Sequence, residues 1–335
     1  MLKRNSFDTI KNATEKYALE VLIMKAIIIE QYGDANQLKE KDDIPVPEIK
    51  DNQVLVEMHA TSINPIDWKL REGYLQEGVP FEFPIILGWD AAGVIKQVGK
   101  NVTSFQVGDE IFARPALTRN GTYAAYTAVD EKLLAMKPKN ISFEEAAAVP
   151  LAGLTAWQCL VNFSEIKKGD RVLIHAGSGG VGSMAIQIAK SFDAYVASTA
   201  SGKNETFLKE LGVDQFINYK EEDFEDVLQD YDIVVDTLGG EILNKSFHVL
   251  KEGGRLVSIA GQPDEKLAKQ KGVKAGFLWL EPDGGELSEL GKLMEDGKLK
   301  PYIGHTFPLI ENGLKEAHRL SETHHAKGKI VIQIK

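Results

Sequence analysis

One glycine-rich segment constrains the fold of this chain more than any other part of its sequence. Residues 171–190 read RVLIHAGSGGVGSMAIQIAK, in which an apolar run of strand length leads through clustered glycines into a stretch with helical periodicity. In such a turn Gly177 permits a sharp bend, Gly179 lets the backbone approach a pyrophosphate, and Gly182 lets the helix pack closely on the strand. The free N–H groups and the positive end of the helix would then bind the pyrophosphate. The segment predicts a dinucleotide-binding turn.

The chain beyond this turn alternates apolar runs with helical stretches, and the apolar runs are AYVASTA, QFINY, YDIVVDT, RLVSIA and KAGFLWL. Continuous apolar runs suit strands that are buried on both faces, as in a doubly wound parallel sheet of the α/β class. Glycine is common in turns of every kind. Here, however, the strand before the turn, the helix after it and the units that follow all agree. A dinucleotide site therefore explains the glycines better than a purely structural turn.

The end of the second strand of this half indicates which dinucleotide is bound. An NAD site typically places Asp or Glu there, about 20 residues beyond the glycines, to bind the ribose hydroxyls. Residues 198–204 read STASGKN, with no carboxylate before Glu205. Ser201 and Lys203 would hydrogen-bond and neutralise a 2′-phosphate. The sequence predicts NADPH, and a solvated loop lysine is the alternative explanation of Lys203.

The first half of the chain has a different rhythm. Between residues 53 and 130, short strand-like runs are separated by glycine and proline, which indicates a compact β-rich unit. Ser142 and Glu145 form the capping box of a helix that leads into the second half. The first strand is expected over 24–30, and residues 1–23 form an N-terminal extension with helical character and no clear partner face.

Charge and composition exclude several classes of partner. The formal net charge of −10 repels polyanions at long range, so neither nucleic acid nor an anionic membrane surface is expected to bind. No apolar run approaches the ~18–20 residues that span a bilayer, and polar residues interrupt the basic N-terminus. Cys159 is the only cysteine, which excludes an intramolecular disulfide and favours a small buried side chain. These features predict a cytoplasmic protein.

Together the motifs resemble the medium-chain dehydrogenase/reductase superfamily, and within it the zeta-crystallin-like quinone oxidoreductase branch. The similarity runs from Met24 to the C-terminus. Its most specific part extends from Gly169 to Lys190, and its supporting parts are SINPIDWKLREG (62–73), FPIILGWDAAGV (83–94), PLAGLTAW (150–157) and AKGKIVI (326–332).

The resemblance implies two domains with the cofactor in the cleft between them. A GroES-like catalytic domain would comprise residues 24–149 and 282–335, and a Rossmann domain would comprise residues 150–281. Carried over position by position, the implied cofactor contacts are Ser178, Gly179, Gly180 and Val181 at the pyrophosphate, Ser201, Lys203 and Tyr219 at the 2′-phosphate, and Thr155, Leu238 and Ala260 near the nicotinamide. For Tyr219, an ordinary aromatic residue at a strand end is an equal alternative.

The zinc alcohol dehydrogenases of the same superfamily polarise an alcohol with a metal held by a cysteine, a His-Glu pair and a third ligand. In this chain Asn64 stands at the cysteine position, Trp89 and Asp90 replace the pair, and the third position falls near Leu151. The single cysteine also leaves no lobe with four clustered cysteines. Zinc requires three or four N, S or O ligands. The resemblance therefore implies zinc-free chemistry.

Hydride chemistry without a metal needs an acceptor that is already electrophilic, such as a quinone or an α,β-unsaturated carbonyl compound. Asn64 is the first candidate for a polar group on the acceptor or the nicotinamide, and a turn residue before Pro65 is the alternative. Lys69 stands where better-known members of the branch carry a tyrosine, which makes it a candidate for the proton donor. A solvated surface charge is an equally good explanation of Lys69. Tyr74 or water are further candidates for the proton donor.

Two other functions remain open from the sequence. One is reduction of an enoyl thioester or another alkene by the same hydride chemistry, and the other is a non-catalytic NADPH-binding redox sensor. The resemblance also implies a homodimer paired through the edge of the Rossmann sheet.

Overall fold

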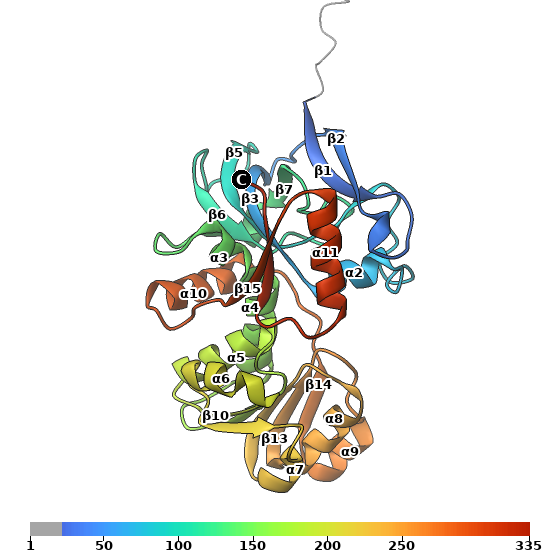
Figure 1. Ribbon diagram of the computed structural model, residues 1–335. Helices are drawn as coiled ribbons and strands as arrows, with labels where there is room; N and C mark the ends of the chain where they lie inside the picture. Colours follow the sequence, from blue (N-terminus) through green and yellow to red (C-terminus); the bar gives the residue numbers. More distant parts are fainter. Residues whose placement is uncertain (1–21) are drawn as a thin grey trace, which may run out of the picture.

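The structure is a computed structural model that describes residues 22–335. It has two lobes, each built around its own sheet (Figure 1). Because residues 1–21 lie outside the described part, the predicted N-terminal extension is seen only at Leu22 and Ile23. No helix within residues 22–335 is both long and apolar enough to cross a membrane.

The lower lobe in Figure 1 contains a six-stranded sheet in the order β11-β10-β9-β12-β13-β14. Every neighbouring pair in this sheet is parallel. The strands are β9 (Arg171–Ile174), β10 (Tyr195–Ala200), β11 (Gln215–Asn218), β12 (Tyr231–Asp236), β13 (Leu250–Ser258) and β14 (Lys274–Phe277). The chain winds outward from β9 in one direction and from β12 in the other, and a ligand crevice forms where such an order reverses. The predicted doubly wound parallel sheet is confirmed.

Helices connect these strands and cover the sheet: α5 (Gly180–Ser191), α6 (Glu205–Glu210), α7 (Phe224–Val227), α8 (Gly240–Lys245) and α9 (Glu265–Lys271). As predicted, α5 begins directly at the glycine-rich turn, with Gly179 as its N-cap.

The upper lobe contains a seven-stranded sheet in which β7 pairs with β3 beside the main order β15-β16-β3-β5-β6-β8. The strands are β3 (Gln53–Ile63), β5 (Ala91–Val98), β6 (Glu110–Ala113), β7 (Tyr126–Asp130), β8 (Leu134–Met136), β15 (Ile303–Pro308) and β16 (Lys329–Gln333). A second sheet has three strands, β1 (Ile23–Ile29), β2 (Lys39–Pro45) and β4 (Ile85–Ile86). The C-terminal strand β16 pairs antiparallel with β3, so the tail returns to the first half of the chain.

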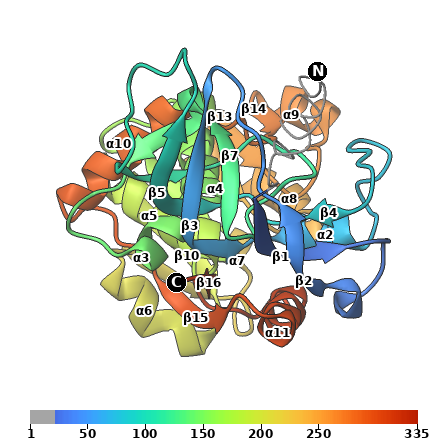
Figure 2. The same ribbon diagram turned by 90° about the horizontal axis from the view of Figure 1, so that it is seen from above.

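The upper lobe also carries α2 (Pro65–Arg71), α3 (Phe143–Ala147), α10 (Gly284–Glu295) and α11 (Glu311–Glu322). In Figures 1 and 2, α10 and α11 lie on different sides of β3. The helix α4 (Pro150–Trp157) continues into a π-helical segment over Gln158–Phe163. Cys159 is buried in that segment, as expected of a small apolar side chain.

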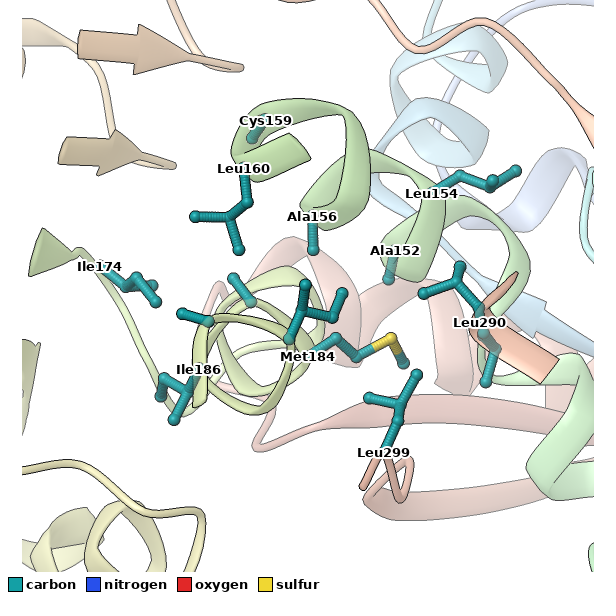
Figure 3. Packing of buried hydrophobic residues seen from close by; sticks show 14 of the residues in the cluster. Ala152, Leu154, Ala156, Cys159, Leu160, Ile174, Met184, Ile186, Leu290 and Leu299 are labelled. Carbon is teal, nitrogen blue, oxygen red and sulfur yellow. The ribbon is translucent and has the colours of Figure 1, made fainter. Parts of the chain in front are cut away.

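One apolar cluster joins α4, α5 and α10 (Figure 3). Met184 of α5 lies between the side chains of α4 and those of Leu290 and Leu299. Deleting a buried leucine side chain from such a cluster costs ~2–5 kcal/mol. This packing holds the start of α4, which comes from the residues just after the upper lobe, against the helix of the glycine-rich turn.

Some strands differ from the prediction. Between residues 53 and 130, β7 begins only at Tyr126, and β3 is an 11-residue strand, longer than the short runs predicted there. The strand β2 was not predicted, because its sequence KEKDDIP is almost entirely charged. Its pairing with β1 overrides the low strand propensity of those residues.

Candidate active site

The glycine-rich turn lies at the carboxyl end of β9, beside the point where the strand order reverses. A Cβ atom at Gly177 would collide with Ser198 Oγ, and one at Gly182 would collide with the carbonyl oxygen of Ala176. At Gly179 the nearest atom to an added Cβ would be 3.4 Å away. The first and third glycines are therefore required by packing, whereas the second leaves the backbone open to a ligand.

The N-terminus of α5 is suited to a phosphate group. The N–H groups of its first turn have no partners within the helix, and the helix dipole is positive at this end. Ser178, Gly179, Gly180 and Val181, the residues predicted to face the pyrophosphate, occupy this end. The carbonyl of Ser178 accepts a 2.8 Å hydrogen bond from the N–H of Gly328, which ties the turn to the strand β16.

The residues predicted to surround the 2′-phosphate lie together at the carboxyl ends of β10 and β11. Ser201 follows β10 directly, and Tyr219 follows β11 with 56% of its surface exposed. Lys203 is exposed and forms no ion pair within the described part of the chain. Asn204, which the prediction missed, donates from Nδ2 to Ser201 Oγ at 3.2 Å and to Ser178 Oγ at 3.1 Å. Asn204 therefore links the two phosphate-facing segments.

The three residues predicted near the nicotinamide differ from one another in exposure, since two are exposed at the sheet edge and one is buried. Leu238 and Ala260 follow β12 and β13 and are exposed, and an added Cβ at Gly239 would come 3.2 Å from Ala260 Cβ. These two turns therefore adjoin at the edge of the sheet. Thr155 is buried on α4, where its hydroxyl donates to the carbonyl of Leu151 at 2.7 Å.

Asn64 belongs to a buried polar cluster with Asp90 and Lys329. Its Nδ2 donates to Asp90 Oδ2 at 2.7 Å, and its Oδ1 accepts from Lys329 Nζ at 2.5 Å. Lys329 Nζ also donates to the carbonyl of Ile63 at 3.1 Å and lies 3.5 Å from Asp90 Oδ2. The three side chains thus close a ring in which an amide joins an ammonium to a carboxylate.

Asp90 is enclosed by donors. Ser62 Oγ donates to its Oδ2 at 2.5 Å, and the backbone N–H of Leu151 at the start of α4 donates to its Oδ1 at 2.8 Å. Burial lowers the pKa of Lys329, and the nearby carboxylate of Asp90 opposes that change. A buried charge is tolerated when it is paired and hydrogen-bonded. The cluster meets that condition at the junction between the two lobes.

The structure brings together Asn64, Asp90 and Leu151, three of the four residues compared with the zinc ligands of alcohol dehydrogenases. The fourth, Trp89, is buried and donates from Nε1 to the carbonyl of Thr118. Across residues 22–335, no group of three or more His, Cys, Asp or Glu side chains is arranged to hold a metal ion. Lys329 places its ammonium group against Asn64 and Asp90. The sequence prediction missed Lys329, although a lysine at the start of the apolar run KIVIQI is a signal that could have found it.

Lys69, the second candidate for catalysis, is not brought to this cluster. It is exposed on α2, and its Nζ lies 5.7 Å from the centre of the Trp68 ring. Tyr74 is also exposed, to 70% of its surface.

A second buried network fixes the backbone of Asn64. The N–H of Asn64 donates to Asp67 Oδ2 at 2.8 Å, which forms part of the capping box of α2. The hydroxyl of Tyr123 donates to the same oxygen at 2.9 Å. Burial raises the pKa of Asp67 to about 7. The start of α2 is therefore held by a carboxyl group whose charge changes near neutral pH.

The network continues from Tyr123 to His318 and Arg71. The hydroxyl of Tyr123 lies 3.1 Å from His318 Nε2, and His318 Nδ1 lies 2.9 Å from Arg71 Nη1. An arginine can only donate, so His318 Nδ1 accepts and Nε2 carries the hydrogen that is donated to Tyr123. Burial, with Arg71 as the second cause, lowers the pKa of His318 to about 3. All donors in this chain therefore point towards Asp67.

Two family models match the chain. The model described as "Alcohol dehydrogenase GroES-like domain" matches residues 50–139, and the model described as "Zinc-binding dehydrogenase" matches residues 211–332. Among curated relatives, the NADPH-dependent alkenal/one oxidoreductase of Arabidopsis thaliana is 38% identical over 92% of this chain and 79% of its own length.

Solved structures agree in fold and in sequence. The quinone oxidoreductase of Coxiella burnetii is 38% identical and covers 94% of this chain and 100% of its own, with a TM-score of 0.86. The Escherichia coli quinone oxidoreductase complexed with NADPH is 28% identical and covers 92% and 100%, with a TM-score of 0.82. On this similarity the chain belongs to the medium-chain dehydrogenase/reductase superfamily, as a relative of its quinone and alkenal oxidoreductases.

Proposed function

We propose that this protein is a zinc-independent, NADPH-dependent reductase that transfers a hydride to a quinone or an α,β-unsaturated carbonyl compound. The observation that carries the proposal is the closed cluster of Asn64, Asp90 and Lys329 beside the glycine-rich turn. The cation in this cluster is the ammonium group of Lys329, and the side chains of the cluster do not form a set of metal ligands among the described residues. The names of the relatives, an alkenal/one oxidoreductase and quinone oxidoreductases, support the same acceptor classes.

NADPH is the cofactor that the sheet edge fits. The open backbone at Gly179 and the end of α5 leave room for the pyrophosphate. Ser201, Lys203 and Tyr219 would hold the 2′-phosphate, and the exposed ammonium of Lys203 has no carboxylate partner in the described residues that would compete for it. Leu238, Ala260 and Thr155 would border the nicotinamide.

When bound, NADPH supplies the hydride, so the work of the chain is to position the reactants and to exclude water. Asn64 has two hydrogens on Nδ2, of which one is donated to Asp90. The second hydrogen would serve an oxygen of the acceptor or the nicotinamide amide. Lys69 is exposed on α2 and is not part of the polar cluster, so water is the proton source that we propose.

The first test compares the oxidation of NADPH and NADH against a panel of quinones and enones, with a metal chelator present. We expect turnover that resists the chelator and strongly prefers NADPH. A preference for NADH would overturn the 2′-phosphate site, and loss of activity to the chelator would overturn zinc independence. Binding of NADPH without turnover of any acceptor would favour a redox sensor, and turnover only of enoyl thioesters would favour that narrower reductase.

We also propose the two domains with the boundaries given above, a homodimer and a cytoplasmic location. The outer strand β14 has a free edge within the described residues, and Phe277 and the nearby Trp279 are exposed there to 40% and 56%. This edge is the surface through which a second copy would pair. Light scattering of the purified protein would give its mass in solution, and a monomer would contradict the dimer.

A further inference from the structure

Arg114 is a buried cation without an acidic partner in the described part of the chain. It directly follows β6, is 5% exposed, and donates from Nη1 to the carbonyl of Pro115. Its Nε is buried and has no hydrogen-bond partner among residues 22–335. Burying a charged group without a partner is costly. The N–H at Nε is therefore a donor that the described residues leave unused.

The strand register places Arg114 beside the cluster of Asn64, Asp90 and Lys329. Ala113 of β6 pairs with Ala91 of β5, so Arg114 and Asp90 are the residues that follow at the end of this antiparallel ladder. Asp90 accepts from Ser62, Asn64 and the N–H of Leu151, and no ion pair joins it to Arg114 in the described part of the chain. The guanidinium therefore stands next to the proposed active site and is not neutralised by it.

Its electrostatic surroundings favour an oxygen that carries negative charge. Burial lowers the pKa of Arg114, and Asp90 and Asp67 only partly oppose this effect. Because burial raises the pKa of Asp67 to about 7, that carboxyl group supplies only part of a charge near neutral pH. The unused side of the guanidinium, at Nε, is one of the two faces with which arginine binds oxygens in a fixed, planar geometry.

We propose that Arg114 binds the acceptor oxygen on which negative charge develops during hydride transfer. This inference rests on the proposed reductase function and assigns its oxyanion-stabilising group. Preorganised donors of this kind act mainly in the transition state, because they bind the charged oxygen more strongly than the neutral carbonyl.

For an enone, hydride transfer and protonation are two successive steps. The hydride forms a C–H bond at the β-carbon, the alkene electron pair moves to the bond with the carbonyl carbon, and the carbonyl π pair moves to the oxygen held by Arg114. A proton from water then adds to the α-carbon and restores the carbonyl, while NADPH is oxidised to NADP⁺. With a quinone, the hydride bonds to one carbonyl oxygen, the ring becomes aromatic, and the opposite oxygen, held by Arg114, becomes a phenolate that takes a proton from water.

The test uses the full-length variants Arg114→Met and Arg114→Lys, with Arg119→Met as the control, because Arg119 is exposed in the same loop. Single-turnover hydride transfer is followed by NADPH absorbance, with a series of enones of increasing electron withdrawal. We expect Arg114→Met to lower kcat about 100-fold or more, as removal of an oxyanion-hole donor does. Its NADPH Kd should stay within about twofold of the wild-type value, and its rate should depend more steeply on electron withdrawal. Arg114→Lys should fall between, and Arg119→Met should match the wild type.

Several results would overturn the assignment. One is an unchanged kcat in Arg114→Met, and another is a loss of NADPH affinity large enough to account for the loss of rate. A third is a loss of rate that is seen only with acceptors that carry a separate carboxylate. If Arg114→Met does not fold, Arg114→Lys decides by the same criteria.

A binding measurement keeps this inference separate from the proposed function. The phenolate of 4-nitrophenol, which resembles the developing oxyanion, is titrated by absorbance into the NADP⁺ complex. Arg114→Met should weaken its binding about tenfold or more, and equal affinity would overturn the role of Arg114. If the wild type reduces no acceptor but binds the phenolate more tightly than Arg114→Met does, the proposed reductase function fails while the anion site stands.

Discussion

The ammonium group of Lys329 lies 2.5 Å from Oδ1 of Asn64. This contact joins the first residue of the C-terminal strand β16 to the N-cap of α2. The neighbouring Gly328 donates to Ser178 in the glycine-rich turn. Residues 328 and 329, at the start of β16, therefore connect the proposed cofactor-binding turn to the polar cluster.

Replacement of Lys329 by methionine should remove the only ammonium group in this cluster. Asp90 would then keep a buried charge without its cation, and breaking a buried pair in this way typically costs ~3–5 kcal/mol of unfolding free energy. We expect a loss of this size in urea unfolding, together with loss of reductase activity. Lys100→Met, at a lysine with 73% side-chain exposure, is the control and should change little.

A double variant tests the pairing itself. Lys329→Met with Asp90→Asn should be less destabilised than the sum of the two single variants, because the second change removes the unpaired charge. Simple additivity of the two effects would contradict a direct interaction.

Lys203→Ala should weaken binding of NADPH and leave binding of NADH unchanged. A hydrogen bond to a charged group contributes ~1.5–3 kcal/mol, which corresponds to a Kd raised about 10- to 100-fold. Fluorescence titration with both cofactors measures the effect. The matched control is Lys209→Ala, because that exposed lysine pairs with Glu205 on α6. Equal weakening of both cofactors would argue against a 2′-phosphate contact.

Two glycines of the cofactor turn should respond differently to alanine. Gly182→Ala should impair folding, because its Cβ would collide with the carbonyl of Ala176. Gly179→Ala should fold normally but bind NADPH more weakly, because its Cβ has room within the protein and would instead face the ligand. Thermal unfolding and NADPH titration separate the two outcomes, with Gly78→Ala as a control at an open position. A fully functional Gly179→Ala variant would contradict close approach of the pyrophosphate.

Asp67→Asn should change how stability depends on pH. The pKa of Asp67 is about 7 in the folded protein and 3.8 in its ordinary state, so the folded state binds the extra proton between these values. Stability from Asp67 is therefore full below about pH 4 and is lost as the pH rises to about 7.

The isosteric Asn variant lacks this loss, so it should gain stability relative to the wild type across that window, by up to ~1.4 kcal/mol per pH unit. Comparison with the wild type removes the opposite effect of His318, whose pKa of about 3 makes stability rise with pH up to its ordinary value of 6.5. Urea unfolding between pH 4.5 and 8 measures the difference, and a constant difference would refute the raised pKa.

Local sequence patterns were sufficient for the parts of the fold whose causes are local. The glycines at 177, 179 and 182 predict the turn and the start of α5, and Ser142 and Glu145 form the predicted capping box at 3.0 and 3.2 Å. The apolar runs predict the parallel strands because a continuous apolar run is suited to a strand that is buried on both faces. These features depend on residues a few positions apart, so the chain determines them by itself.

Only the tertiary structure decided which distant residues meet. The charged segment β2 forms a strand because it pairs with the edge of β1. Lys329 lies against Asn64 because β16 pairs with β3. Asn204 and Arg114 are likewise positioned by segments distant in the sequence, Asn204 by its hydrogen bond to Ser178 and Arg114 by the pairing of β6 with β5. Contacts between residues far apart in sequence follow from sheet register and packing. The polar groups of the candidate site were therefore visible in the sequence as residues, but their partners were not.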